Sequence, residues 1–162
     1  MKILYIINSK EYSYHKNIIT DFTRNIPGMV FDMGDGADYG MRYHEIEANS
    51  PDVIITFDLA GFELRTGGDT LSLNNLYARM AHILFHKPDY YGNNLRLRQN
   101  LSMFTYIPCD ENILEYGSRY PEIPNICEFV SIINNADNDS DHKDNQSNIR
   151  EWWEEFKKAA ML

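Results

Sequence analysis

At residues 51–63 the chain reads PDVIITFDLAGFE, and this stretch decides the fold. Residues 53–57 form an uninterrupted apolar and β-branched run, which is too short for a free-standing helix and is bounded by a proline and a glycine. Such a run is typical of a strand covered on both faces in the middle of a parallel sheet. Polar residues including Asp58 and Glu63 follow it, and open α/β sheets bind ligands outside the carboxyl ends of their strands. The stretch therefore predicts a central strand and a place for a ligand.

Similar apolar runs recur along the chain and predict further strands at residues 3–7, 29–33, 81–85, 103–107 and 126–133. Helices are predicted between them at residues 14–26, 39–49, 73–80 and 89–99, and from Asp110 onward. This alternation predicts a doubly wound α/β fold, in which a mostly parallel sheet of about five to six strands carries helices on both faces. The expected architecture is a three-layer sandwich of the Rossmann or flavodoxin type.

The composition divides the chain into three parts. Residues 1–133 carry all the predicted strands and are expected to form one domain. Residues 134–148 contain no large apolar residue, which predicts a flexible polar linker. Residues 149–162 are expected to form an amphipathic helix, because Trp152, Trp153 and Phe156 lie on one apolar stripe. This helix must dock on something, either its own domain or another subunit, since two tryptophans left in water favour aggregation.

Charge and cysteine content exclude some partners and environments. The net charge of −9 argues against a nucleic-acid-binding protein, which needs a clustered basic face. No segment approaches the ~20 apolar residues of a membrane span, and the first residues lead directly into a predicted strand instead of a secretory signal. Cys109 and Cys127 form neither a CxxC motif nor a metal spacing. We therefore expect a cytoplasmic protein with reduced cysteines and no membrane span.

Polar side chains follow several of the predicted strands. Because parallel strands place their carboxyl ends on one edge, we expect the ligand cleft there to be lined by Asn8, Ser9, Asp58, Glu63 and His86. A histidine beside carboxylates could supply a general base. Polar residues at strand ends are also ordinary turn and cap chemistry, so no catalytic residue is assigned.

A second candidate is an anion site at residues 65–70. Gly67 and Gly68 precede the helix predicted at 73–80, so the backbone amides near Thr70 could bind an anion with help from Arg65, although a surface loop would explain the same residues. Neither GxGxxG after the first strand nor GxxxxGK[ST] occurs, and we expect no cofactor. We also expect no metal site, because His82 and His86 would lie ~13 Å apart on one strand.

Three stretches together resemble a known family: PDVIIT at residues 51–56, HILFHKP at 82–88 and FTYIPCDEN at 104–112. They look like the N-terminal, Rossmann-like half of GT-B glycosyltransferases, particularly the spore-maturation-protein-like branch, and the order of elements agrees over residues 1–133. In that family the N-terminal half chiefly shapes the acceptor side, while the second half supplies most nucleotide-sugar contacts. The resemblance implies an acceptor-side domain that binds a nucleotide sugar or a glycan acceptor and is not a complete transferase alone.

Two alternatives remain open. The first is a non-enzymatic flavodoxin-like or receiver-like regulatory module that dimerises or docks on a protein partner through the Trp152/Trp153 helix. Asp58 and Lys87-Pro88 look like the corresponding residues of response-regulator receivers, but NSK at residues 8–10 replaces the acidic pair expected there. The second is a flavodoxin-like redox protein, for which the loop after the first strand lacks the usual phosphate cradle. Whether the protein is an enzyme stays undecided by the sequence.

Overall fold

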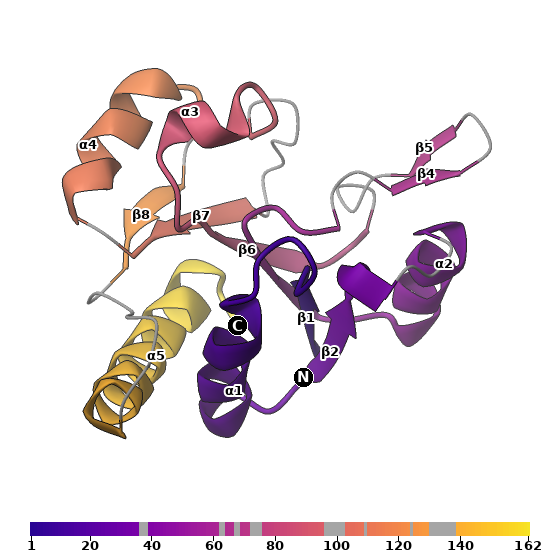
Figure 1. Ribbon diagram of the computed structural model, residues 1–162, viewed down its shortest axis with the longest axis horizontal. Helices are drawn as coiled ribbons and strands as arrows, with labels where there is room; N and C mark the ends of the chain where they lie inside the picture. The colour runs from indigo at the N-terminus through magenta and orange to yellow at the C-terminus, as the bar shows by residue number, and fades with distance from the viewer. Residues whose placement is uncertain are drawn as a thin grey trace.

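The computed structural model describes residues 1–35, 39–61, 64–66, 69–71, 76–95, 103–108, 110–123, 125–129 and 139–162. A six-stranded parallel sheet in the order β2-β1-β3-β6-β7-β8 forms its centre (Figure 1). The strands are β1 (Ile3–Ile7), β2 (Met29–Asp32), β3 (Val53–Phe57), β6 (Arg79–Ile83), β7 (Met103–Ile107) and β8 (Ile126–Glu128). The chain runs outward from β1 to β2, then crosses back to β3 and continues the other way. The predicted doubly wound α/β fold is therefore confirmed, with its topological switch point between β1 and β3.

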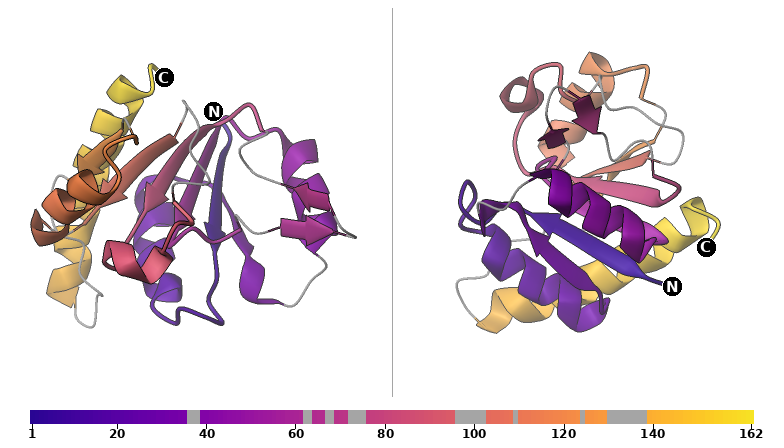
Figure 2. Two further views of the ribbon diagram at one scale, coloured as in Figure 1. Left: turned by 90° about the horizontal axis from the view of Figure 1, so that it is seen from above. Right: turned by 90° about the vertical axis from the view of Figure 1, so that its right-hand side faces the viewer.

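Helices cover both faces of the sheet. They are α1 (His15–Asn25), α2 (Tyr39–Asn49), α3 (Pro88–Tyr91), α4 (Asp110–Arg119) and α5 (Asp139–Ala159), with a short 3-10 turn η1 at Met33–Asp35. One core layer contains buried residues of α2, α3 and α4, and the other contains those of α1 and α5. Helices α1 and α5 lie side by side although they are far apart in the sequence (Figure 1 and Figure 2). This arrangement is the predicted three-layer sandwich.

Burial on both faces explains the continuous apolar runs of the central strands. In β3, Ile54 packs into the layer of α2 and α4, whereas Val53 and Ile55 pack into the layer of α1 and α5. Every residue of β1, β3 and β7 is buried, so none of these strands needs a polar face. The predicted bounds of these three strands match the observed ones for the same reason.

The predicted linker is wrong from Asp139 onward, because α5 begins there and runs for 21 residues. Residues 134–138 lie outside the described residues. The polar part of α5 is held by polar contacts with α1: the buried Asn145 side chain donates to Asp21 Oδ2 at 3.1 Å, and Arg150 Nε donates to Asn25 Oδ1 at 2.8 Å. A stretch without large apolar residues can therefore be helical when the neighbouring helix offers hydrogen-bond partners.

The C-terminal helix docks on its own domain. Trp152 and Phe156 are fully buried, and the Trp152 ring packs against Phe22 of α1 with centroids 5.5 Å apart. Trp153 is half-buried against the same core layer. The suggestion that Trp152 and Phe156 form a surface for another subunit is thus wrong, because the intramolecular core already covers both side chains.

The helix predicted at residues 73–80 is also wrong over its described part, because residues 76–78 form a bend and a strand follows them. Two short antiparallel strands, β4 (Leu64–Thr66) and β5 (Asp69–Leu71), form a hairpin beside α2. Strand β6 then begins at Arg79, two residues earlier than expected, and Met80 alternates with Ala81 between the two core layers. Pairing with β3 and β7 therefore overrides a local helical spacing. Residues 72–75 lie outside the described residues.

Two further elements are shorter than predicted. Helix α3 ends at Tyr91, because Gly92 has a positive φ of 56° that does not continue the helix. Residues 96–99 of the helix expected over 89–99 lie outside the described residues. Strand β8 ends at Glu128, and residues 130–133 of the predicted strand are not among those described. Within the described ranges, no helix has the length and apolar character needed to cross a membrane.

Candidate functional site

The candidate site lies at the carboxyl ends of β1, β3 and β6, at the topological switch point. Asp58 directly follows β3, and its side chain is fully buried. Asp58 and Leu59 both have positive φ angles, 50° and 60°, which are unfavourable for residues other than glycine. The turn is stabilised by the Asp58 N–H, which donates to the Ile83 carbonyl at 2.9 Å. This sharp turn directs the Asp58 carboxylate into the site instead of continuing the strand.

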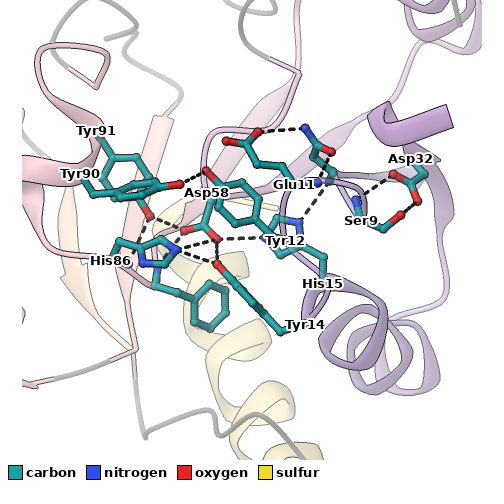
Figure 3. Close-up of polar contacts among 12 residues, drawn as sticks. Ser9, Glu11, Tyr12, Tyr14, His15, Asp32, Asp58, His86, Tyr90 and Tyr91 are labelled. Carbon is teal, nitrogen blue, oxygen red and sulfur yellow. Dashed lines mark hydrogen bonds and ion pairs between the residues drawn. The ribbon is translucent and has the colours of Figure 1, made fainter. Parts of the chain in front are cut away.

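The Asp58 carboxylate accepts four hydrogen bonds, two on each oxygen (Figure 3). Oδ1 accepts from the Phe85 backbone N–H at 3.0 Å and from the Tyr91 hydroxyl. Oδ2 accepts from His15 Nε2 at 3.0 Å and from the Tyr14 hydroxyl. Because a carboxylate offers about four lone-pair sites, both oxygens are saturated. Asp58 therefore organises the site and has no free oxygen for a ligand.

These contacts set the ionisation of the buried groups. Burial by itself raises the Asp58 pKa, but the hydrogen bonds from His15 and from the two tyrosine hydroxyls outweigh it and hold this pKa below its ordinary value of 3.8. Burial, reinforced by the neighbouring carboxylate, raises the pKa of Tyr14 and of Tyr91 far above the ordinary value of 10.0. Asp58 is thus an anion and both tyrosines keep their protons.

His15 is a buried structural member of this group. It is the first residue of α1, and its ring has no exposed surface. The Asn8 backbone N–H donates to His15 Nδ1 at 3.1 Å, so Nδ1 carries no proton. The ring proton is therefore on Nε2, which donates it to Asp58. His15 joins the loop after β1 to the end of β3.

An accessible aromatic surface, the aromatic platform, is formed by Tyr12, His86 and Tyr90. The His86 and Tyr90 rings are stacked with centroids 4.2 Å apart, and the hydroxyls of Tyr12 and Tyr90 are 2.6 Å apart (Figure 3). The His86 side chain is 34% exposed and Tyr90 is 52% exposed. His86 Nε2 lies 2.9 Å from the Tyr14 hydroxyl and 3.9 Å from Asp58 Oδ2. The platform thus lies directly beside the buried carboxylate.

The backbone at His86 is held in place by hydrogen bonds between its carbonyl and N–H groups and two tyrosine hydroxyls. The His86 carbonyl accepts from the Tyr116 hydroxyl at 2.6 Å, and the His86 N–H donates to the Tyr91 hydroxyl at 3.3 Å. Helix α3 begins two residues later with Pro88, and Arg119 of α4 forms an ion pair with Asp89 of α3. His86 and Tyr90 of the platform are therefore carried by a constrained backbone.

The predicted site residues Asn8 and Ser9 reach the same edge but serve the loop itself. The Asn8 side chain accepts from the Glu11 N–H and donates to Glu11 Oε2, both at 3.1 Å. Ser9 donates through its N–H, at 3.0 Å, and through its hydroxyl to Asp32 at the end of β2. Burial raises the Asp32 pKa, but these bonds and one from the Gly34 N–H lower it overall. Both residues therefore position the loop that carries Tyr12 and Tyr14.

The structure brings some predicted residues together and not others. Asp58 and His86 lie side by side, as expected from the parallel sheet. Glu63, Gly67 and Gly68 are not among the described residues, and Arg65 and Thr70 are paired across the β4–β5 hairpin. Because a strand and not a helix contains Thr70, the anion site loses the helix N-terminus on which it was predicted. In the described ranges, no cluster of histidine, cysteine or acidic side chains could hold a metal ion.

Most of the aromatic residues around Asp58 are not among the site residues predicted from the sequence. Tyr14 is the first residue of the helix predicted at 14–26, whereas it lies at the N-cap position of α1 and its hydroxyl reaches Asp58. The sequence does contain a signal for these aromatic residues. EYSYH at residues 11–15 and DYY at 89–91 are rich in tyrosine and histidine, and they follow β1 and β6 at the carboxyl ends of the strands. Comparisons with protein-family models, curated proteins and solved structures give no match to this chain. Its function is therefore inferred from the geometry of the site.

Proposed function

We propose that the protein binds a neutral, hydroxyl-rich ligand, a sugar or a glycan, at the aromatic platform. The observation that carries this proposal is the stack of His86 on Tyr90, with Tyr12 beside it, at the carboxyl edge of the sheet. Ligand sites in open α/β sheets lie at this edge, next to the switch point. Partly exposed rings there offer an apolar face together with polar atoms at the ring edges.

The chemistry of the platform suits a sugar ring. The C–H face of a sugar can lie on an aromatic ring, while its hydroxyl groups bond to phenol oxygens and imidazole nitrogens. Here the Tyr12 and Tyr90 hydroxyls and the His86 ring supply such polar atoms within one small area. A few polar groups that fix the orientation of a ligand over an apolar face are usual in small-molecule sites.

The charges beside the platform favour a neutral ligand over a phosphate. The Asp58 carboxylate lies under His86, with Oδ2 3.9 Å from Nε2. Arg119 of α4 is paired with Asp89, and the chain as a whole carries a net charge of −9. The diphosphate of a nucleotide sugar would meet this negative potential. A glycan acceptor is therefore the preferred ligand, and a nucleotide sugar is the weaker candidate.

These features agree with an acceptor-side domain of a glycosyltransferase-like protein, in which a second domain would bind the sugar donor. On this proposal the described chain holds the acceptor and does not complete the transfer alone. The regulatory module that docks through its tryptophan helix has less support, because Trp152 and Phe156 are buried in the core of their own domain.

Titration of ¹⁵N-labelled protein with maltotriose, methyl β-glucoside and UDP-glucose tests the proposal by NMR. We expect saturable shifts at residues of the platform with the neutral sugars, and weaker effects with UDP-glucose. Tyr90→Ala should lower the affinity about tenfold, which equals about 1.4 kcal/mol and is within the range for an aromatic contact. Tyr77→Ala is the matched control, because Tyr77 is fully exposed and lies before β6, at the opposite edge of the sheet. Absence of saturable shifts with all three compounds would contradict the proposal.

A further inference from the structure

We propose that Tyr14 and Asp58 hold His86 in the tautomer that is protonated on Nε2, so that Nδ1 is the atom that accepts a hydrogen bond or a proton from a hydroxyl group. The identity of that hydroxyl, as part of a bound sugar, rests on the proposed function. The tautomer itself follows from the geometry of the unliganded site.

The directions of the hydrogen bonds from His86 through Tyr14 to Asp58 are set by the carboxylate. An ionised carboxylate only accepts, so the Tyr14 hydroxyl uses its one proton to donate a hydrogen bond to Asp58 Oδ2. The Tyr14 oxygen can then only accept across its 2.9 Å contact with His86 Nε2. Nε2 must therefore carry the ring proton, and a neutral imidazole then has its lone pair on Nδ1.

The opposite arrangement leaves two acceptors in contact. If His86 Nε2 carried no proton, the Tyr14 hydroxyl would have to donate to it, and the Tyr14 oxygen would face Asp58 Oδ2 without a proton between them. The hydrogen bond from Tyr14 to Asp58 would be lost, and hydrogen bonds to a charged acceptor are among the stronger ones in proteins. The low pKa of Asp58 and the high pKa of Tyr14 keep both groups in the states that this reasoning requires.

His15 and His86 share the same carboxylate but differ in what Nδ1 does. Nδ1 of His15 is occupied by the Asn8 N–H at 3.1 Å, and the ring is fully buried. Nδ1 of His86 has no hydrogen-bond partner among the described residues, and this side chain is one-third exposed. His15 is therefore structural, whereas His86 presents Nδ1 as a free acceptor within the platform.

The arrangement also fits proton transfer. A proton taken from a ligand hydroxyl would move from its oxygen to His86 Nδ1, and the electron pair would stay on that oxygen. The resulting imidazolium would be stabilised by Asp58 Oδ2, 3.9 Å from Nε2, while Tyr14 and Asp58 keep their own protonation states. A base that is oriented by a further group is a recurrent arrangement in catalysis. Tyr14 and Asp58 are thus positioning residues, and His86 is the group that meets the ligand.

The groups that face His86 from the surrounding elements are consistent with a single negative charge. Tyr12 and Tyr14 approach from the segment between β1 and α1, Asp58 from the end of β3, and Tyr90 and Tyr91 from α3. Burial is the largest cause that raises the pKa of Tyr12, as it is for Tyr14 and Tyr91. Asp58 is the carboxylate in contact with the His86 ring, and Glu11 acts on Tyr12 beside it.

Long-range ¹H–¹⁵N NMR of the histidine rings tests the tautomer without any ligand. At alkaline pH, where imidazoles are neutral, we expect His15 and His86 both to be protonated on Nε2, with the His86 signals assigned by their loss in His86→Gln. His15 Nδ1 should show the shift of a hydrogen-bonded nitrogen, and His86 Nδ1 that of a free one. In Tyr14→Phe, His86 should become a mixture of tautomers while His15 stays unchanged, and Tyr77→Phe should alter neither.

Two results of this experiment would overturn the proposal. A proton on Nδ1 of His86 in the wild-type protein contradicts it without need of any variant. An unchanged single tautomer of His86 in correctly folded Tyr14→Phe shows that Tyr14 does not position the ring.

Alkylation tests the reactive atom independently. The free lone pair of an imidazole attacks the methylene carbon of iodoacetamide and displaces iodide, so modification of His86 is expected on Nδ1. Modification on Nε2 would refute the proposal. If maltotriose binds, the ¹⁵N chemical shift of His86 Nδ1 should move toward that of His15 Nδ1, which is hydrogen-bonded. Binding without this change would show that no sugar hydroxyl donates to His86 Nδ1. If maltotriose does not bind, the proposed function is contradicted. The assignment of the His86 tautomer is then still tested by the ring NMR and by the site of alkylation.

Discussion

Replacement of Asp58 by asparagine should destabilise the protein even though the two side chains have nearly the same shape. The carboxylate places one oxygen against the Phe85 N–H and the other against His15 Nε2–H. Neither donor can become an acceptor, because one is a backbone amide and the tautomer of the other is fixed by the Asn8 N–H. Whichever way the new amide lies, its NH₂ group faces one of these two buried donors.

The expected loss is about 3 kcal/mol. An unsatisfied buried donor costs about 1–3 kcal/mol, and the remaining bonds lose roughly 1 kcal/mol each when their acceptor is no longer charged. Relief from burying a charge offsets part of this sum. Since domains are stable by about 5–15 kcal/mol, such a loss lowers the unfolding midpoint clearly without preventing folding.

Urea unfolding, followed by tryptophan fluorescence and circular dichroism, measures the effect as a lower midpoint with an unchanged m-value. Asp52→Asn is the control, because the Asp52 side chain is 55% exposed, and its change should stay within about 1 kcal/mol. Because the folded-state pKa of Asp58 is lowered, its contribution is present above the unfolded-state value of about 3.9 and is lost as the pH falls further. The difference between wild type and Asp58→Asn should therefore shrink below about pH 4. A loss under about 1 kcal/mol at pH 7, or a difference that does not change with acid, would refute the reasoning.

Four further substitutions, in two pairs, test the packing of α5 and the surroundings of two glycines. Trp152→Ala should lower the free energy of unfolding in urea by about 3–5 kcal/mol, because the Trp152 ring is fully buried. Trp153→Ala should lower it clearly less, because that ring is half-buried. Equal losses would contradict the docking of α5. Gly117→Ala should stabilise the protein by about 0.5–1 kcal/mol, because Gly117 lies in helix α4 with nothing within 4 Å of an added Cβ. Gly34→Ala should destabilise the protein by about 1–3 kcal/mol, because the added Cβ would lie 2.8 Å from the backbone nitrogen of Lys10. Unfolding temperatures that shift in the same direction for Gly117→Ala and Gly34→Ala would contradict these two predictions.

The central strands could be predicted from the sequence because their physical requirement is simple. A strand buried on both faces needs apolar, aromatic or β-branched residues at every position, and residues 3–7, 53–57 and 103–107 meet that requirement without a break. Strand β6 begins two residues before the strand predicted at 81–85, because Arg79 and Met80 fall within the helix predicted at 73–80. Non-local pairing with β3 decided the outcome there.

The polar part of α5 could not be predicted from local composition. Its residues lack apolar side chains, and their stabilising partners lie on α1, more than a hundred positions away in the sequence. Asn145 is buried because Asp21 accepts its amide proton, a contact that has no sequence signature. Local patterns report burial against an apolar core much better than burial against a polar partner.

The candidate site was predicted in its position and missed in its chemistry. The parallel topology placed Asp58 and His86 on one edge, and they lie together there. The role of Tyr14 could not be recognised, because a tyrosine contributes to an apolar stripe by its ring and to a polar network by its hydroxyl. The hydroxyl of Tyr14 bonds to a residue 44 positions away, so only the fold reveals that Asp58 is saturated and that His86 is the accessible group.

The central claim is that His86 and Tyr90 form a ligand platform beside a saturated carboxylate. A titration of ¹⁵N-labelled protein with maltotriose tests it most directly, with the His86 ring nitrogens and the backbone amides of α3 observed together. We predict saturable shifts confined to the platform, with His86 Nδ1 changing more than Nε2. Saturable binding that leaves these signals unchanged and shifts another surface would contradict the claim.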